Sequence, residues 1–135
     1  MKKYVPLIGR VLLGLIFVMS GINKITGFEG TQQYMASYGI PLTSVSLIGA
    51  ILVEILGGLS IIAGYKARWG ALALFAFLIP ATLIFHTDFS NQTQMIMFLK
   101  NLSIMGGLLL VATYGSGPLS VGEPGRISEA ALEAA

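Results

Sequence analysis

The stretch TSVSLIGAILVEILGGLSIIAG, residues 43–64, decides the fold. A hydrocarbon core of about 30 Å needs about 20 mostly apolar residues in one helix. This stretch meets that length with a single charged side chain, Glu54. Three further stretches, residues 5–25, 69–85 and 95–114, are comparably apolar, and none alternates with the two-residue period of a barrel strand. The sequence therefore predicts an all-α integral membrane protein with a bundle of four transmembrane helices.

The composition also indicates that the chain lies in a lipid bilayer. The chain has 135 residues, of which 55% are hydrophobic and only 10% charged, whereas soluble domains carry about 25% charged residues. A net charge of +2 is too small for the basic surface that phosphate backbones require, so we expect no nucleic-acid partner. The absence of cysteine excludes disulfides, thiolate zinc sites and iron–sulfur clusters within this chain.

The basic residues predict how the chain is oriented. Most of them would lie on the side of the termini: Lys2, Lys3, Lys66, Arg68 and Arg126. The positive-inside rule then makes both termini cytoplasmic. We expect residues 1–117 to form the membrane domain and residues 118–135 to form a polar, disordered cytoplasmic tail. Residues 26–42, with several aromatic side chains, would lie in the interface and cap the bundle.

Ionisable residues inside a span are costly and need a partner or a purpose. Glu54 is expected to pair with Arg10 of the first span, with Lys100 of the fourth, or with both. Each charge heads a stripe of 3–4 spacing, and such a stripe faces one direction on a helix. The predicted packed faces are residues 10, 14, 17, 21 and 24; 47, 51, 54, 58 and 61; 72, 75, 79, 82 and 86; and 100, 103, 107 and 110. Glycines on these faces would allow close helix packing.

The polar groups together predict a pocket that opens toward the extracytoplasmic face. Its candidate ligand-binding residues are Arg10, Lys24, Glu54, His86, Lys100 and Asn101. No metal site is expected. Three interpretations stay open at this point: the charges neutralise one another and fix the helix register, they line a ligand or redox pocket, or they form a proton or ion path.

An ordered set of motifs resembles a known family. The motifs are Arg10-x3-Gly14-x6-Gly21-x2-Lys24, Gly27-x2-Gly30-Thr31-Gln32-Gln33-Tyr34-Met35, Glu54-x2-Gly57-Gly58, Phe77-x2-Pro80-Ala81 with His86, and Lys100-Asn101-Leu102-x3-Gly106-Gly107. Together they resemble the DoxX family of small bacterial inner-membrane proteins, in particular its short, YqjF-like branch. The resemblance implies a multi-pass protein of the bacterial cytoplasmic membrane. It also implies a link to membrane redox or stress complexes, because some relatives are described as subunits of a thiosulfate:quinone oxidoreductase.

The leading functional hypothesis is an accessory or quinone-contacting subunit with an intramembrane polar pocket around Glu54. The chain would hold no cofactor of its own beyond a quinone, and a redox partner subunit would carry the electrons. A homo-oligomer is compatible with the sequence. The alternatives are a structural membrane scaffold with no ligand and a small transporter of protons or apolar molecules. Whether the protein is an enzyme is left open.

Overall fold

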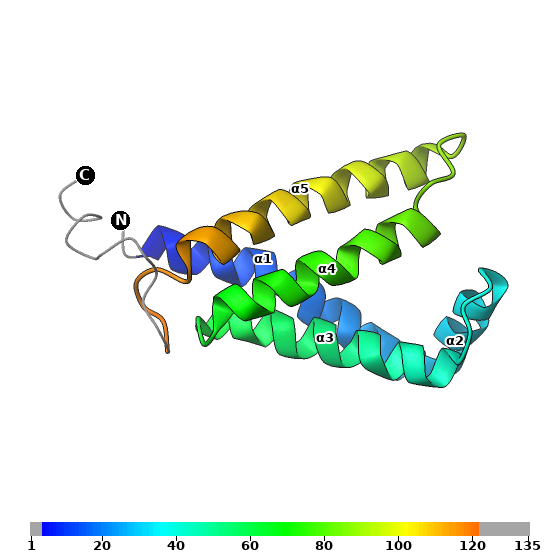
Figure 1. Ribbon diagram of the computed structural model, residues 1–135, viewed down its shortest axis with the longest axis horizontal. Coiled ribbons are helices and arrows are strands. Elements are labelled where there is room, and N and C mark those ends of the chain that lie inside the picture. Colours follow the sequence, from blue (N-terminus) through cyan, green and yellow to red (C-terminus); the bar gives the residue numbers. More distant parts are fainter. Residues whose placement is uncertain (1–3, 122–135) are drawn as a thin grey trace.

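The computed structural model describes residues 4–121, and in this range the chain is entirely helical apart from turns and loops. The helices are α1 (Tyr4–Thr26), α2 (Phe28–Ser37), α3 (Thr43–Ala63), α4 (Ala67–Phe85) and α5 (Gln92–Tyr114) (Figure 1). All except α2 are long and apolar enough to cross a membrane. The predicted all-α fold with four spanning helices is confirmed, and α2 is a short extra helix within the segment expected to cap the bundle.

The four long helices are arranged as an open row rather than a closed bundle. Helix α1 packs on α3, α3 on α4, and α4 on α5, whereas α1 and α5 barely touch. The start of α1 and the end of α5 lie at one end of the molecule, which we call the proximal end (Figure 1). Helix α2 and the α4–α5 loop lie at the opposite, distal end.

Glycines set the close approach of α1 and α3. A Cβ added to Gly14 would lie 2.7 Å from the carbonyl oxygen of Gly58, and one added to Gly58 would lie 2.9 Å from that of Gly14. Small residues allow such backbone contact in lipid, where no hydrophobic force drives helices together. The predicted faces of these helices are largely confirmed, because α1 buries Arg10, Gly14, Phe17 and Gly21 and α3 buries Leu47, Ile51, Glu54, Gly58 and Ile61.

The predicted faces of α4 and α5 are mostly wrong. Helix α4 buries Ala67, Ala71, Leu74, Leu78 and Thr82, so that of the predicted stripe only Thr82 is buried. On α5 the predicted residues 100, 103 and 110 are exposed, and Leu108 is its only buried residue. The reason is that α5 packs mainly on α4 and is apolar on its other sides, which face lipid, so its sequence carries little directional signal.

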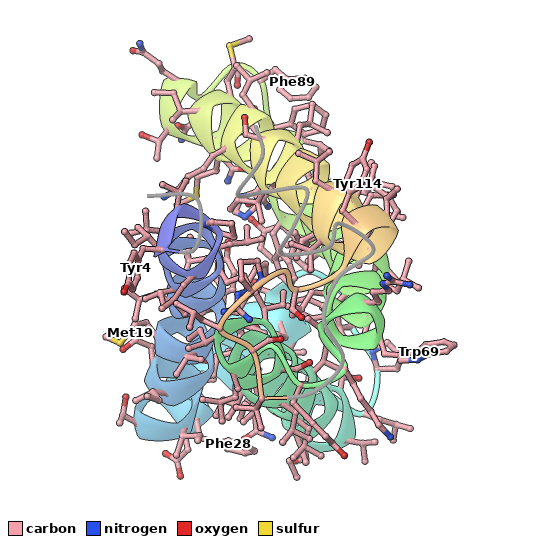
Figure 2. All side chains as sticks on the ribbon, turned by 90° about the vertical axis from the view of Figure 1, so that its left-hand side faces the viewer. Tyr4, Met19, Phe28, Trp69, Phe89 and Tyr114 are labelled. Carbon is pink, nitrogen blue, oxygen red and sulfur yellow. The ribbon has the colours of Figure 1, made fainter. Side chains whose placement is uncertain are left out.

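Large side chains cover the outside of the row. Met19, Trp69 and Tyr114 project outward around its perimeter (Figure 2), and Trp69 is 73% exposed. An apolar surface this extensive would be a liability in water but is the normal surface of a helix in lipid. Inside the row, one buried cluster joins all four long helices: Phe17, Ile61, Ala71, Leu74, Leu78 and Leu108.

Candidate functional site

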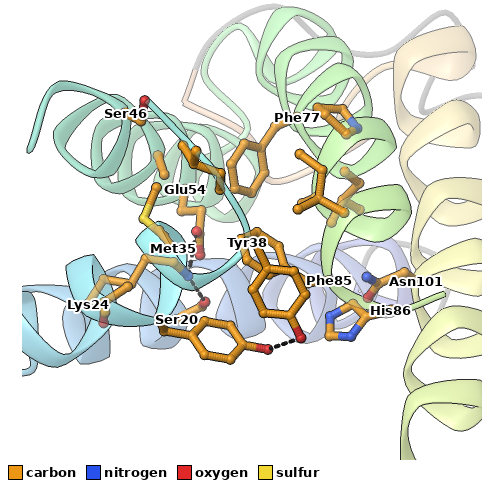
Figure 3. Close-up of a pocket in the computed structure, with 18 of the residues that line it drawn as sticks. Ser20, Lys24, Met35, Tyr38, Ser46, Glu54, Phe77, Phe85, His86 and Asn101 are labelled. Carbon is orange, nitrogen blue, oxygen red and sulfur yellow. Dashed lines mark hydrogen bonds and ion pairs between the residues drawn. The ribbon is translucent and has the colours of Figure 1, made fainter. Parts of the chain in front are cut away.

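A cavity of about 820 Å³ lies in the distal half of the molecule (Figure 3). Every helix contributes to its wall, and most of the lining side chains are apolar or aromatic. Its polar lining residues are Ser20, Asn23, Lys24, Thr31, Tyr34, Tyr38, Ser46, Glu54, His86 and Asn101. A large apolar cavity with a few convergent polar groups is the usual form of a small-molecule site.

A buried ion pair forms one side of the cavity. Lys24 Nζ lies 2.7 Å from Oε1 of Glu54, whose side chain is only 2% exposed. The same ammonium group donates a hydrogen bond of 2.8 Å to Ser20 Oγ (Figure 3). The pair joins α1 to α3 and leaves Glu54 neutralised within the bundle, at a position where a lone carboxylate would be very costly.

Arg10 is not the partner of Glu54, and this expectation is wrong because of the register between α1 and α3. In the antiparallel packing, Gly21 lies opposite Glu54, since a Cβ on Gly21 would meet Glu54 Cβ at 3.6 Å. Arg10 lies about 16 Å further toward the proximal end, at 1.5 Å per residue. Lys24 lies one turn beyond Gly21 toward the distal end. Side chains on a helix point toward its N-terminus, so the Lys24 side chain extends back to the level of Gly21 and reaches Glu54.

Arg10 instead holds the segment that follows α5. Its Nη2 donates to the carbonyl oxygens of Leu119 at 2.8 Å and Pro118 at 3.5 Å, and the side chain is 3% exposed. The amide of Val121 donates to the carbonyl of Ala63 at 2.9 Å. Residues 118–121, the first of the predicted tail, are thus fixed to α1 and α3, while residues 122–135 lie outside the described part of the chain.

On α5 the two predicted site residues separate. Lys100 is exposed and does not line the cavity, so the expected pairing with Glu54 is also wrong. Asn101, one residue along, lines the cavity and donates from Nδ2 to Thr82 Oγ1 at 3.0 Å, which ties α5 to α4. Four of the six predicted residues therefore share the cavity: Lys24, Glu54, His86 and Asn101.

Three aromatic side chains form a contact that the sequence did not predict. The ring of Tyr34 stacks on Phe85 at 5.4 Å between centroids, and the ring of Tyr38 meets Phe85 edge-on at 4.9 Å. Tyr34 also donates a hydrogen bond of 3.4 Å to the hydroxyl of Tyr38. We call these three residues the aromatic clasp, because they join α2 and the residue after it to α4. The aromatic content of residues 26–42 was the available signal, but nothing in it pointed to Phe85.

His86 and Tyr34 have shifted pKa values. Desolvation by burial lowers the pKa of His86 below its ordinary value of 6.5, so the imidazole is neutral at physiological pH. Its Nδ1 is buried and has no hydrogen-bond partner within residues 4–121. The hydrogen bond to Tyr38, with burial, raises the pKa of Tyr34. Both groups are thus neutral, and Figure 3 shows His86 beside Asn101, across the cavity from Lys24 and Glu54.

The described residues include no group of three His, Asp or Glu side chains that could hold a metal ion. The polar groups of the cavity have the chemistry to hydrogen-bond a neutral ligand. Two neutral groups, His86 and Asn101, face a compensated charge pair across an apolar space.

Fold and cavity define a small multi-pass membrane protein with four spanning helices and an intramembrane polar cavity. The chain belongs to the DoxX family, whose sequence signature matches residues 5–87. It is 41% identical to the inner membrane protein YqjF of Escherichia coli strain K12, over 85% of this chain and 87% of that one. It is 37% identical to the inner membrane protein YphA of the same organism, over 85% and 86%. The protein is thus a multi-pass inner-membrane protein.

A more partial relative carries a functional name. The chain is 39% identical to a Bacillus subtilis strain 168 protein whose name reads "putative oxidoreductase CatD", over 44% of this chain and 42% of that one. No solved structure matches this chain.

Proposed function

We propose that this protein is an accessory subunit of a membrane-associated redox or stress-response system, and that its distal cavity contacts a quinone. The observation that carries the proposal is the cavity itself: about 820 Å³ of mostly apolar space with neutral hydrogen-bonding groups on one side and a buried ion pair on the other. The oxidoreductase name of CatD supports a redox setting, although it belongs to that protein.

The lining residues fit a planar ring with two carbonyl oxygens. Asn101 uses one amide hydrogen on Thr82 and keeps the second for a ligand. His86 is neutral, so it can donate from one ring nitrogen and accept at the other. Aromatic rings of the clasp offer stacking surfaces beside these groups. A ring bound here would be held by His86 and Asn101 between apolar walls.

The ion pair places a hydrogen-bonded polar group on the opposite wall of the same cavity. Lys24 contacts both Glu54 and Ser20, and Glu54 would take part in protonation of a bound ring. A quinone, when bound, supplies two-electron, two-proton chemistry. The electrons would come from a flavin- or metal-bearing partner subunit.

Binding of a short-chain benzoquinone to the purified protein tests the proposal. We expect saturable binding that weakens by about 5- to 150-fold for His86→Gln and for Asn101→Ala, since each lost hydrogen bond in a buried site is worth about 1–3 kcal/mol. Lys100→Ala is the matched control, because Lys100 adjoins Asn101 on α5 but does not line the cavity. Melting temperatures measured in parallel report on folding.

If the unmodified protein shows no saturable binding, the proposed function is wrong and a scaffold without ligand takes its place. If instead the protein in liposomes carries a proton flux that Glu54→Gln abolishes, a transporter is the better description.

A further inference from the structure

The open row of helices leaves a break on one side of the cavity. Helices α1 and α5 barely touch, and they approach only near the proximal end, where a Cβ on Gly107 would lie 3.4 Å from Leu13 Cδ1. Toward the distal end the two helices diverge (Figure 1). We call this line between α1 and α5 the seam.

The cavity reaches the seam. Ile16 and Ser20 of α1 line it on one side, and Asn101 and Ile104 of α5 line it on the other. Ile16, which lines the cavity here, keeps 37% of its surface exposed. Both α1 and α5 are membrane-spanning, and the seam therefore faces hydrocarbon rather than water.

The distal end of the cavity, unlike the seam, is bridged by side-chain contacts. Its wall there comes from Tyr34, Tyr38 and the segment through Pro41, and the aromatic clasp joins this wall to α4 at Phe85. Ring contacts with centroids 4.9 and 5.4 Å apart leave no space for a ligand between the two parts. The clasp thus bridges the cavity at its distal end, whereas no ring contact or hydrogen bond among residues 4–121 bridges α1 and α5 along the seam.

We propose that the cavity takes its ligand laterally from the distal leaflet of the bilayer, through the α1–α5 seam, and that the clasp stays closed during entry. The ligand is then a membrane-dissolved amphiphile with an apolar tail, and its tail lies in the seam while its polar ring lies among His86 and Asn101. This inference rests on the proposed function for the identity of the ring, but the route of entry is tested separately.

The test measures association and dissociation rates of a decyl-substituted benzoquinone with the protein in lipid nanodiscs. Quenching of a tryptophan in the cavity reports binding, in a Trp69→Phe, Phe77→Trp background, since Trp69 is 73% exposed and Phe77 lines the cavity. The chain has no cysteine, so introduced thiols are modified without background. Tyr38→Cys with Phe85→Cys, joined by a short bis-maleimide that adds to both thiols, locks the clasp. Ile104→Cys or Ile16→Cys, labelled with a bulky maleimide, obstructs the seam.

We expect cross-linking to leave both rates within about twofold of those of the same double-cysteine variant before cross-linking, a comparison in which loss of the two rings cancels. Seam labels should slow association and dissociation together by tenfold or more. Label at Leu109, an exposed residue of α5 outside the cavity lining, is the control and should change neither rate.

Slow entry after locking the clasp would overturn the lateral route, as would seam labels that leave the rates unchanged or that reduce affinity without slowing dissociation. The melting temperature shows whether a label unfolds its variant. If the label at Ile104 does so, the label at Ile16 on the opposite side of the seam is used, and the reverse. Absence of binding to the unlabelled reporter protein, confirmed with the unmodified chain, would instead contradict the proposed function.

Discussion

Lys24 Nζ and Glu54 Oε1 lie 2.7 Å apart, and this contact links α1 to α3 at the edge of the cavity. Lys24 keeps 26% of its side chain exposed, whereas Glu54 keeps 2%. The two partners are therefore unequal. Lys24 can turn toward the polar distal end if its partner is removed, but Glu54 has no other basic group near it among the described residues.

This inequality predicts the outcome of a double-mutant cycle. Lys24→Ala should destabilise the protein more than Glu54→Ala, because it leaves a buried carboxylate alone, at a cost of about 3–5 kcal/mol by analogy with soluble proteins. The double variant should be more stable than Lys24→Ala. Thermal unfolding in detergent measures all three, and Arg10→Ala with Glu54→Ala is the control pair, whose losses should add. If the losses of stability in the Lys24→Ala and Glu54→Ala variants simply add in the double variant, the ion pair contributes nothing to the stability of the fold.

Glycines of α3 should respond in opposite directions to alanine. Gly58→Ala should lower stability by about 1–3 kcal/mol, because the new Cβ would lie 2.8 Å from Val18 Cγ2 and 2.9 Å from the Gly14 carbonyl oxygen. Gly49→Ala, in the same helix but with no atom within 4 Å of its Cβ, should raise stability by about 0.5–1 kcal/mol. Melting temperatures of the two variants check this. Equal effects would contradict the packing of α1 on α3.

Arg10 should determine how firmly the segment after α5 is held against α1 and α3. Arg10→Met removes the hydrogen bonds to the carbonyls of Leu119 and Pro118, and bonds to a charged donor are worth about 1.5–3 kcal/mol. Hydrogen exchange at the amide of Val121, which is bonded to Ala63, should accelerate about tenfold or more. Lys66→Met, a change to an exposed basic residue at the same end, serves as the control and should leave that amide protected.

Acidification should weaken the fold through His86. Its folded pKa is below the ordinary value of 6.5, so the folded state binds fewer protons than the unfolded state once the pH falls toward that value. The free energy of unfolding is thus unaffected well above pH 6.5, and decreases as the pH passes through 6.5 until the folded pKa is reached. His86→Gln should remove this component. Melting curves of both proteins between about pH 8 and pH 5 test it, and parallel curves would argue against it.

The basic residues predict that both termini are cytoplasmic. Lys66 and Arg68 lie in and after the turn between α3 and α4 at the proximal end, where the positive-inside rule places cytoplasmic loops. A topology reporter inserted after Arg68 should report the cytoplasm, and one inserted at Gly39 should report the outside. The reverse pattern would place His86 and the distal cavity on the cytoplasmic side.

The sequence predicted a helix's buried face correctly where only one side of the helix is packed against its neighbours, because the buried residues then repeat at helical spacing. It failed where a helix is apolar on nearly all sides. Glu54 and Gly58 fell on the predicted face of α3, because that helix is packed along its length between α1 and α4. Lys100 was misplaced because α5 is lipid-facing on most sides. The partner of Glu54 depended on a register that Gly14 and Gly58 set through backbone contact, and no spacing within a single helix contains that information.

The ion pair between α1 and α3 also constrains how the protein is made. Lys24 is synthesised well before Glu54, and its place in the last turn of α1 lets its ammonium group stay in the polar interface until the partner arrives. Helix α2 and the turn after it keep α1 within reach until α3 arrives, and the two charges then enter the hydrocarbon as a neutral pair. Helix α5 is the last of the five in the chain and packs mainly on α4, so it joins a row in which Lys24 and Glu54 already have each other as partners.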